Sequence, residues 1–180
     1  GLGLSRLNVP LVEGLQLVRC FFLVHVVECT FGEILVVDVT AALTRNGDIT
    51  IRSSNISSNS TITSSSGNVI LVTLGNTGLN LGANVSAPTG DVTVQTPLAN
   101  QSIAILNAAN GSATLEVLNS QLAFLQPAGT GNIAVGASSQ TGNLTVYDPV
   151  NVNAALKLTG GNIALLADVT TLNALSLTAT

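Results

Sequence analysis

Acidic side chains that could do acid–base chemistry are sparse after residue 46 of this 180-residue chain. Hydrolysis or elimination of a polysaccharide needs clustered carboxylates, or a carboxylate beside Arg or Lys. A groove that pairs Lys157 with Asp148 or Asp168 would meet this need, whereas isolated charges at the corners of a fold would not. The charged residues available for such a site are Asp48, Asp91, Glu116, Asp148, Lys157 and Asp168. We favour the interpretation that these charged residues lie solvated at the corners of the fold, and we predict no catalytic residue.

Side chains that bind metals are also few, with one His and two Cys in the whole chain. His25 lies in an apolar run without ligand partners, which favours a buried side chain. Cys20 and Cys29 could form a disulfide, but two buried thiols are the simpler interpretation. The segment GGNIAL at 160–165 lacks the Asp of the calcium-binding nonapeptide, and no GxSxG motif occurs. We therefore expect no metal and no cofactor.

The overall composition excludes several classes of protein. Only 8% of the residues are charged, against about 25% in an average soluble domain. Five Lys and Arg residues and a net charge of −4 cannot cover a phosphate backbone, so we expect no nucleic-acid partner. The hydrophobic content of 46% is too high for a disordered acidic segment. The most apolar stretch, residues 11–27, is interrupted by Glu13, Arg19 and His25, so no membrane span is predicted.

The chain divides near residue 46 into two regions of different composition. Nine of its fourteen charged residues lie in residues 1–53. The runs FFLVHVV at 21–27 and EILVVDV at 33–39 indicate either strands buried on both faces or a short buried helix. We expect residues 1–46 to form an apolar N-terminal cap or the first irregular coils, and residues 47–180 to form one repeat region. A chain that starts at Gly1 without Met and stops within a pattern at Thr180 suggests a segment of a longer or processed protein.

The second region repeats a short unit in which Gly is followed by a small polar residue and then by apolar–x–apolar. The copies are GDITI at 47–51, GNVIL at 67–71, GDVTV at 90–94, GSATL at 111–115, GNIAV at 131–135, GNLTV at 142–146 and GNIAL at 161–165. Most successive copies are separated by about 20 residues, as in a repeat protein. The interval from Gly131 to Gly142 is close to half of the others, which suggests a half-period of about ten residues between strand units.

Each unit alternates with a period of two residues, which predicts a strand with one buried face. The predicted inward pairs are Ile49/Ile51, Val69/Leu71, Val92/Val94, Ile133/Val135, Leu144/Val146 and Ile163/Leu165. Matching strands without Gly are expected at Leu79/Leu81, Ile103/Ile105, Leu122/Phe124, Leu156/Leu158 and Leu175/Leu177. Short strands with corners between them predict an all-β fold, a single-stranded parallel β-helix (solenoid) with coils of about 20 residues. A sandwich of antiparallel hairpins is the competing fold.

The repeat region resembles the filamentous haemagglutinin-type repeats of large secreted bacterial exoproteins, which include two-partner-secretion adhesins and autotransporter passengers. The similar segments are GDVTVQT at 90–96, TGNLTVYD at 141–148 and GNIALLADVTTLNALSLTAT at 161–180. The resemblance implies a right-handed parallel β-helix, export to the exterior of the bacterial outer membrane, and adhesion. Two features depart from the family pattern, namely the irregular spacing at 131–142 and the first 45 residues, which do not look like its secretion domain.

From these features we predict a non-catalytic structural shaft segment of a secreted or surface-exposed, adhesin-like protein that mediates attachment or presentation. Its partners would be a host-cell or surface receptor or glycan, and the neighbouring coils of a longer parent chain. A carbohydrate-active β-helix enzyme is one alternative. An ice-binding solenoid is another, because Thr recurs at the outward middle position of the repeat, although Ile70, Ala134 and Ala164 interrupt the column.

Overall fold

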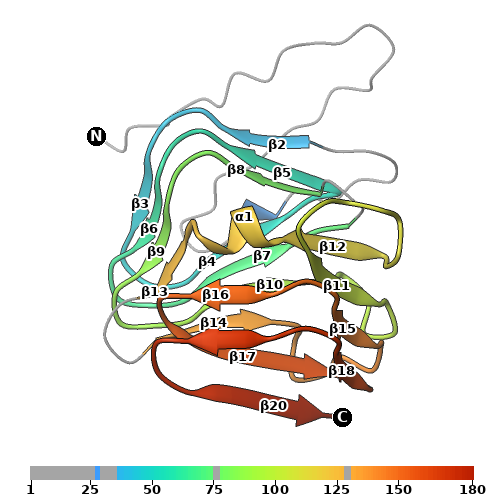
Figure 1. Cartoon of the computed structure of the whole chain (residues 1–180). Helices are drawn as coiled ribbons and strands as arrows, with labels where there is room; N and C mark the ends of the chain where they lie inside the picture. The colour runs from blue at the N-terminus through green and yellow to red at the C-terminus, as the bar shows by residue number, and fades with distance from the viewer. Residues whose placement is uncertain (1–26, 29–35, 75–77, 128–130) are drawn as a thin grey trace, which may run out of the picture.

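The chain folds as a β-solenoid. The computed structural model describes residues 27–28, 36–74, 78–127 and 131–180, and the predictions for Cys20, His25 and Cys29 lie outside these residues. Within them, twenty strands and one four-residue helix wind around a common axis (Figure 1). Every strand pair is parallel, so the predicted parallel β-solenoid is confirmed and the antiparallel sandwich is wrong. The single helix described is too short to cross a membrane.

One seven-stranded sheet runs through the whole described structure, and we call it the long sheet (Figure 1). Each coil contributes one strand to it, because the apolar–x–apolar segment after each corner buries alternate side chains. Its strands are β1 (Val27–Glu28), β4 (Ile49–Arg52), β7 (Val69–Val72), β10 (Val92–Gln95), β14 (Asn132–Val135), β17 (Ala155–Gly160) and β20 (Leu175–Ala179).

The first coils close with two further sheets, at the top and left of Figure 1. The upper sheet consists of β2 (Val36–Val39), β5 (Asn55–Ser58) and β8 (Leu79–Leu81). The left sheet consists of β3 (Leu43–Arg45), β6 (Ile62–Ser64), β9 (Val85–Ala87) and β13 (Leu125–Pro127). Each of these coils therefore has three sides.

The later coils close differently, with a right sheet and a front pair of strands (Figure 1). The right sheet has the order β12 (Leu115–Leu118), β11 (Ile103–Leu106), β15 (Leu144–Val146), β18 (Ile163–Leu165). The front pair is β16 (Val150–Val152) and β19 (Val169–Thr171). The later coils thus have a sheet on the right of the solenoid, whereas the first coils have one on the left.

A single long coil joins the two arrangements. Along the long sheet, Ile49 pairs with Val69 and Val69 with Val92, so each of these coils has the length that the repeat predicts. The next pair in the sheet is Val92 and Ile133, and the chain between them is about twice as long. The extra chain forms β11, β12 and the helix α1 (Asn119–Leu122) before it reaches β13. We call residues 96–127 the transition segment.

Two predicted strands in the transition segment are wrong. In GSATL at 111–115 only Leu115 lies in a strand, and Gly111 turns within a loop with a φ of 76°. Leu122 belongs to α1 and Phe124 to the turn after it, so this apolar pair does not form a strand. The physical reason is that α1 takes the place of a strand between β8 and β16, both of which it contacts. Leu122 is buried all the same, because the helix turns it into the core.

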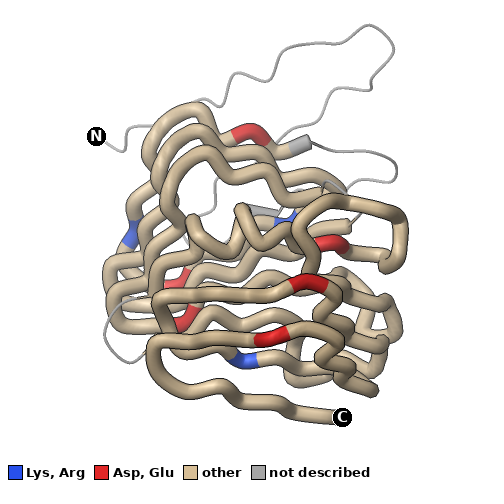
Figure 2. The backbone as a smooth tube through the Cα atoms, in the orientation of Figure 1, with Lys and Arg blue, Asp and Glu red and all other residues tan. Residues whose placement is uncertain are grey.

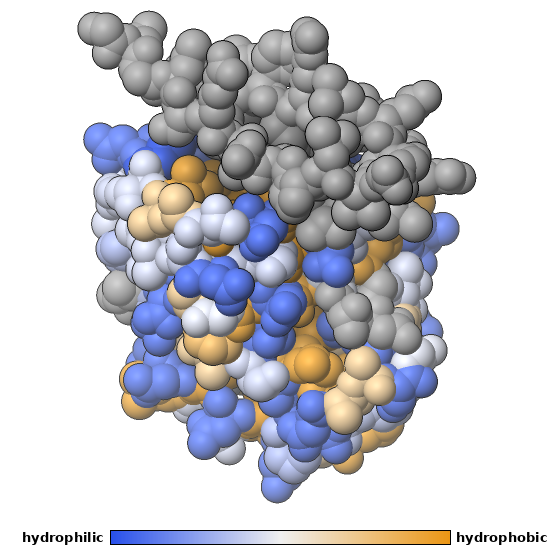
Figure 3. Space-filling model, turned by 90° about the horizontal axis from the view of Figure 1, so that it is seen from above, coloured by the Kyte–Doolittle hydropathy of each residue, from blue (hydrophilic) through white to orange (hydrophobic). Residues whose placement is uncertain are grey.

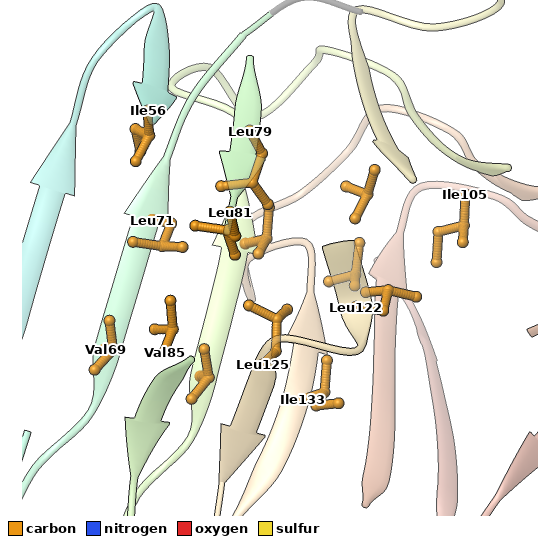
Figure 4. Packing of buried hydrophobic residues seen from close by; sticks show 14 of the residues in the cluster. Ile56, Val69, Leu71, Leu79, Leu81, Val85, Ile105, Leu122, Leu125 and Ile133 are labelled. Atoms are coloured by element: carbon orange, nitrogen blue, oxygen red, sulfur yellow. The ribbon is translucent and has the colours of Figure 1, made fainter. Parts of the chain in front are cut away.

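The predicted inward residues line one continuous apolar core between the sheets. The pairs of β4, β7, β10, β14 and β15 are all buried, and their side chains pack against residues of the opposite sheets (Figure 4). In the final coil, Ile163 is only partly buried and Leu165 is 40% exposed. Both occupy inward positions, since they pair with the buried Leu144 and Val146. Their exposure follows from the absence of a further coil over them in the described structure.

The described residues before position 47 are part of the solenoid. β1 pairs with Ile51–Arg52, and β2 and β3 pair in register with β5 and β6. In β2 the side chains of Val37 and Val39 are buried whereas Asp38 is exposed. Residues 36–39 therefore form a strand and not a helix, but the predicted burial on both faces is wrong, since Asp38 faces solvent.

Candidate functional site

The corner before each strand of the first long-sheet coils is a column of glycines. A Cβ atom on Gly131 would lie 2.2 Å from the carbonyl oxygen of Gly90, and one on Gly90 would lie 2.5 Å from that of Gly67. Neither distance is possible between real atoms, so neighbouring coils approach too closely here for any side chain. The repeated Gly of the sequence is explained by this contact.

The residues that follow these glycines form a ladder of alternating carboxylates and amides. Asp48 Oδ1 accepts the main-chain N–H of Asn68 at 2.7 Å. Asn68 Oδ1 accepts the N–H of Asp91 at 2.9 Å, and Asp91 Oδ1 accepts both the N–H and the side-chain amide of Asn132 at 2.9 Å. Because an amide separates the two carboxylates, like charges do not occupy adjacent rungs about 4.8 Å apart. The predicted corner residues Asp48 and Asp91 thus hold successive coils together.

Glu116 is the most deeply buried charged residue among those whose side chains are described, with 1% of its surface exposed. Its carboxylate accepts the main-chain N–H groups of Asn110 and Ser112 at 3.0 and 2.6 Å, and the hydroxyl of Ser112 at 3.2 Å. These bonds fix the loop between β11 and β12 against the right sheet, so the carboxylate has a structural task in this loop.

Asp148 lies where the right sheet ends. Its Oδ2 atom accepts the N–H of Asn107 at 2.7 Å, and the Asn107 side-chain oxygen accepts the amide of Asn119 at 2.8 Å. Asn119 also donates to the carbonyl oxygen of Pro149 at 3.0 Å. Its own Oδ1 atom is buried and has no hydrogen-bond partner. The side chains of Asp148, Asn107 and Asn119 form a polar row, which we call the right-hand row.

The structure does not bring Lys157 together with the two C-terminal aspartates. Lys157 is exposed on β17 of the long sheet, whereas Asp148 and Asp168 follow β15 and β18 of the right sheet. No ion pair links Lys157 to either carboxylate in the described structure. Charged residues are few along the coils (Figure 2). Among the described residues no group of three or more His, Cys, Asp or Glu side chains could hold a metal ion.

The outward Thr residues do not form one regular column. Pairing along the long sheet aligns Thr50, Ile70, Thr93, Ala134 and Lys157. Thr145 and Ala164 lie on the right sheet instead, because their strands pair with β11 and with each other. Thr114 lies in the loop before β12. The flat Thr face that the sequence suggests is therefore divided between two sheets.

A pocket that sequence reasoning missed opens between the transition segment and β16. It has a volume of about 340 Å³, and its interior is formed by buried apolar residues that include Leu122, Ile133 and Val152. Its rim contains the exposed side chains of Gln126, Asn151 and Asn153. No short motif indicates this pocket, because the pocket results from the replacement of a strand by α1. We call it the β16 pocket.

The α1 helix also completes the hydrogen bonding of β8. The side-chain oxygen of the buried Gln121 accepts the N–H of Leu81, which in a regular solenoid would bond to the next strand.

Comparisons with protein-family models, with curated proteins and with solved structures found no match to this chain. The interpretation of the site therefore depends on its geometry and chemistry.

Proposed function

We propose that this chain is a non-catalytic structural shaft segment of a secreted or surface-exposed, adhesin-like protein. The observation that supports it best is the use of the carboxylates. Asp48, Asp91, Glu116 and Asp148 each accept main-chain N–H groups that tie a coil or a loop in place. A carboxylate engaged in this way is a structural element of the rod.

The distribution of charge supports the same function. In a parallel stack, equivalent positions of neighbouring coils are about 4.8 Å apart, so repeated charges would repel one another. The chain avoids this by using Asn, Ser, Thr and aliphatic residues on its outer faces. A rod with uncharged faces can extend by adding coils without accumulating repulsion, which is what a shaft requires.

The resemblance to haemagglutinin-type repeats supports the proposed location and role. Segments such as TGNLTVYD at 141–148 match the style of those repeats, and the proteins that contain them are exported and adhere to surfaces. We extend that location and that role to this chain as part of the proposal.

Two assays on the purified full chain test the proposal. Beads coated with the chain should be retained on cultured cells or glycan-coated surfaces more strongly than beads coated with albumin. A panel of soluble polysaccharides incubated with the same preparation should release neither reducing ends nor unsaturated sugars. In the source organism, antibodies against the chain should label intact cells.

If the unmodified chain cleaved a polysaccharide and the Asp148→Asn or Asp168→Asn variant did not, the non-catalytic function would be overturned. The Asn107→Ala variant distinguishes chemistry from folding, since it alters a neighbour of Asp148 without removing a carboxylate. Labelling confined to permeabilised cells would contradict the surface location.

A further inference from the structure

Amide side chains are abundant on the surface of this rod. The chain has 18 Asn residues, and the surface seen from above is mostly hydrophilic, with only small, separate apolar patches where grey atoms do not cover it (Figure 3). Only Asn46 and Asn110 are followed directly by Gly. Because Gly has no side chain to shield its main-chain nitrogen, that nitrogen can attack the side-chain carbonyl carbon of the preceding Asn. The two Asn–Gly pairs are therefore the candidate sites of spontaneous deamidation.

The pair Asn110–Gly111 lies in the exposed loop between β11 and β12. The side-chain oxygen of Asn110 accepts the N–H of Ser112 at 2.9 Å, which closes an Asx turn around Gly111. This bond would stabilise the negative charge that forms on the oxygen during attack. Gly111 has a φ of 76°, and its own N–H has no hydrogen-bond partner among the described residues. The attacking nitrogen is thus free, and the carbonyl group is held close to it.

The pair Asn46–Gly47 has the same two residues in a different environment. Asn46 is also exposed, and Gly47 has a similar φ of 91°. Here, however, the N–H of Gly47 donates to Ser66 Oγ at 3.1 Å, and its carbonyl oxygen accepts the hydroxyl of Ser64 at 2.8 Å. The corner also lies between β3 and β4, which are both paired with the next coil. Attack requires the loss of a hydrogen bond, so the reaction should be slower at this corner.

We propose that Asn110 is a self-modifying site, at which an amide becomes a carboxylate with water as the only co-reactant. The Gly111 nitrogen bonds to Asn110 Cγ and gives up its proton, and the side-chain amide takes up this proton and leaves as ammonia. Water then opens the cyclic imide at one of its two carbonyl carbons, and neither step is a redox reaction. Opening at Cγ gives aspartate, whereas opening at the main-chain carbon gives isoaspartate, in which the main chain passes through Cβ.

The new carboxylate would loosen the loop, because it forms next to Glu116. The N–H of Ser112 is shared between Asn110 Oδ1 at 2.9 Å and Glu116 Oε1 at 2.6 Å. Glu116 is 1% exposed, although it points away from the core that contains its neighbours Leu115 and Val117. Water therefore screens its charge poorly, and two carboxylates at this place repel each other. Conversion should release the loop from the right sheet.

Incubation of the purified full chain in mildly alkaline buffer made with heavy-oxygen water tests the proposal. Peptide mass spectrometry follows the conversion of each Asn, and enzymatic methylation identifies isoaspartate. Asn110 should convert at least about tenfold faster than Asn46, and its product should contain heavy oxygen from the water. In the urea-denatured chain the two rates should differ by less than about threefold, because the N–H of Gly47 is no longer held there.

Two variants of exposed serines beside Asn46 separate the hydrogen bond from the local sequence. Ser66→Ala removes the acceptor of the Gly47 N–H and should accelerate conversion of Asn46 by about threefold to tenfold. The rate at Asn110 should not change. Ser65→Ala is the control, because Ser65 bonds to this corner through its main-chain N–H, which the substitution keeps. It should leave the rates at both sites unchanged.

Two substitutions at residue 110 test the release of the loop. Asn110→Asp places the carboxylate of the product beside Glu116 and should accelerate hydrogen exchange in residues 107–114 at least about threefold, with exchange in β4 unchanged. Asn110→Gln is the neutral control, because Glu116 still accepts the main-chain N–H groups of residues 110 and 112. Its longer side chain would have to close a larger ring, so this variant should convert more slowly and keep the loop in place.

The reaction is independent of the proposed shaft function, because it needs only the loop and water. Equal rates at the two Asn–Gly pairs of the folded chain, or a product of Asn110 without heavy oxygen, would overturn the modification site. An unchanged rate at Asn46 in Ser66→Ala would overturn the protection by the Gly47 hydrogen bond. Unchanged exchange in Asn110→Asp would overturn the release of the loop. None of these results alters the retention of coated beads on cells, which tests the shaft function separately.

Discussion

The first coils, residues 36–95, and the last coils, residues 132–180, share the long sheet but close it on opposite sides. The first coils use a left sheet, whereas the last coils use a right sheet and reach the long sheet directly from the front pair (Figure 1). Strand pairing along the long sheet is continuous through both. One solenoid thus contains two cross-sections, and the columns of side chains on the long sheet continue from one into the other.

The Gly–Asn/Asp motif changes corner between the two regions. In the first, Gly47, Gly67 and Gly90 precede strands of the long sheet. In the second, Gly142 and Gly161 precede strands of the right sheet, and a Cβ atom on Gly161 would lie 2.0 Å from Thr141 O. The short interval between Gly131 and Gly142 marks the change, since both belong to one coil. The motif therefore identifies the corner where coils approach most closely, whichever sheet follows.

The largest expected effect comes from adding a methyl group at either of these corners. Gly131→Ala and Gly161→Ala would place a Cβ atom 2.2 and 2.0 Å from a carbonyl oxygen of the coil before. Main-chain atoms cannot move aside cheaply, so each variant should lose about 2–4 kcal/mol of unfolding free energy. Thermal and urea unfolding followed by circular dichroism measure the loss.

Gly47→Ala is the matched control, because a Cβ atom there would have no neighbour within 4 Å among the described residues. Its φ of 91° still disfavours alanine by about 1–2 kcal/mol. If Gly47→Ala cost as much as Gly131→Ala, backbone conformation rather than close approach would explain the motif. If only one of the two corner variants were destabilised, the two corners would not be equivalent.

Much of the fold could be predicted from the sequence because each repeat shows by its own alternation which residues of its strand are buried. The alternation in GDVTV identifies Val92 and Val94 as core residues, and the same holds for Ile49, Ile133 and Leu144. Each of these strands buries one face in every coil, so a period of two residues is enough to identify the buried side. Parallel stacking followed from the near-constant phase of the copies.

The transition segment could not be predicted because the conformation of its residues depends on contacts with residues far away in sequence. GSATL matches the repeat, yet Gly111 turns in a loop whose position depends on Glu116. Leu122 has the apolar character of a strand residue, but its neighbour Gln121 bonds to the N–H of Leu81, far earlier in the chain. The β16 pocket and the right-hand row result from this rearrangement, and for that reason no motif marked them.

The second effect concerns the helix that joins the two cross-sections. Gln121→Ala would leave the buried N–H of Leu81 without an acceptor, which should cost about 1–3 kcal/mol. Hydrogen exchange at Leu81 should accelerate more than exchange in β4 or β17. Gln126→Ala, which removes an exposed side chain that bonds to Asn84 and to no other described residue, is the control and should cost less than about 0.5 kcal/mol. Equal effects would mean that α1 does not stabilise the β8 edge.

The smallest effect compares the ladders of the two corners. Asp91 accepts a main-chain N–H and a side-chain amide from Asn132, both at 2.9 Å. Among the described residues, the side-chain oxygen of Asn143 accepts only the exposed side-chain amide of Asn162, at 3.2 Å. Asp91→Ala should therefore cost about 1–1.5 kcal/mol and Asn143→Ala less than about 0.5 kcal/mol, as measured by urea unfolding.

Asp91→Asn separates the carbonyl-type acceptor from the charge, because an amide oxygen can still accept the N–H of Asn132. We expect it to retain most of the stability that Asp91→Ala loses, as measured by the urea midpoint. A loss in Asp91→Asn as large as in Asp91→Ala would show that the negative charge, and not the acceptor, stabilises the ladder. Alternation of Asp and Asn along the corner would then be a requirement of the first coils, and its absence at Asn143 and Asn162 would be a real chemical difference between the two cross-sections.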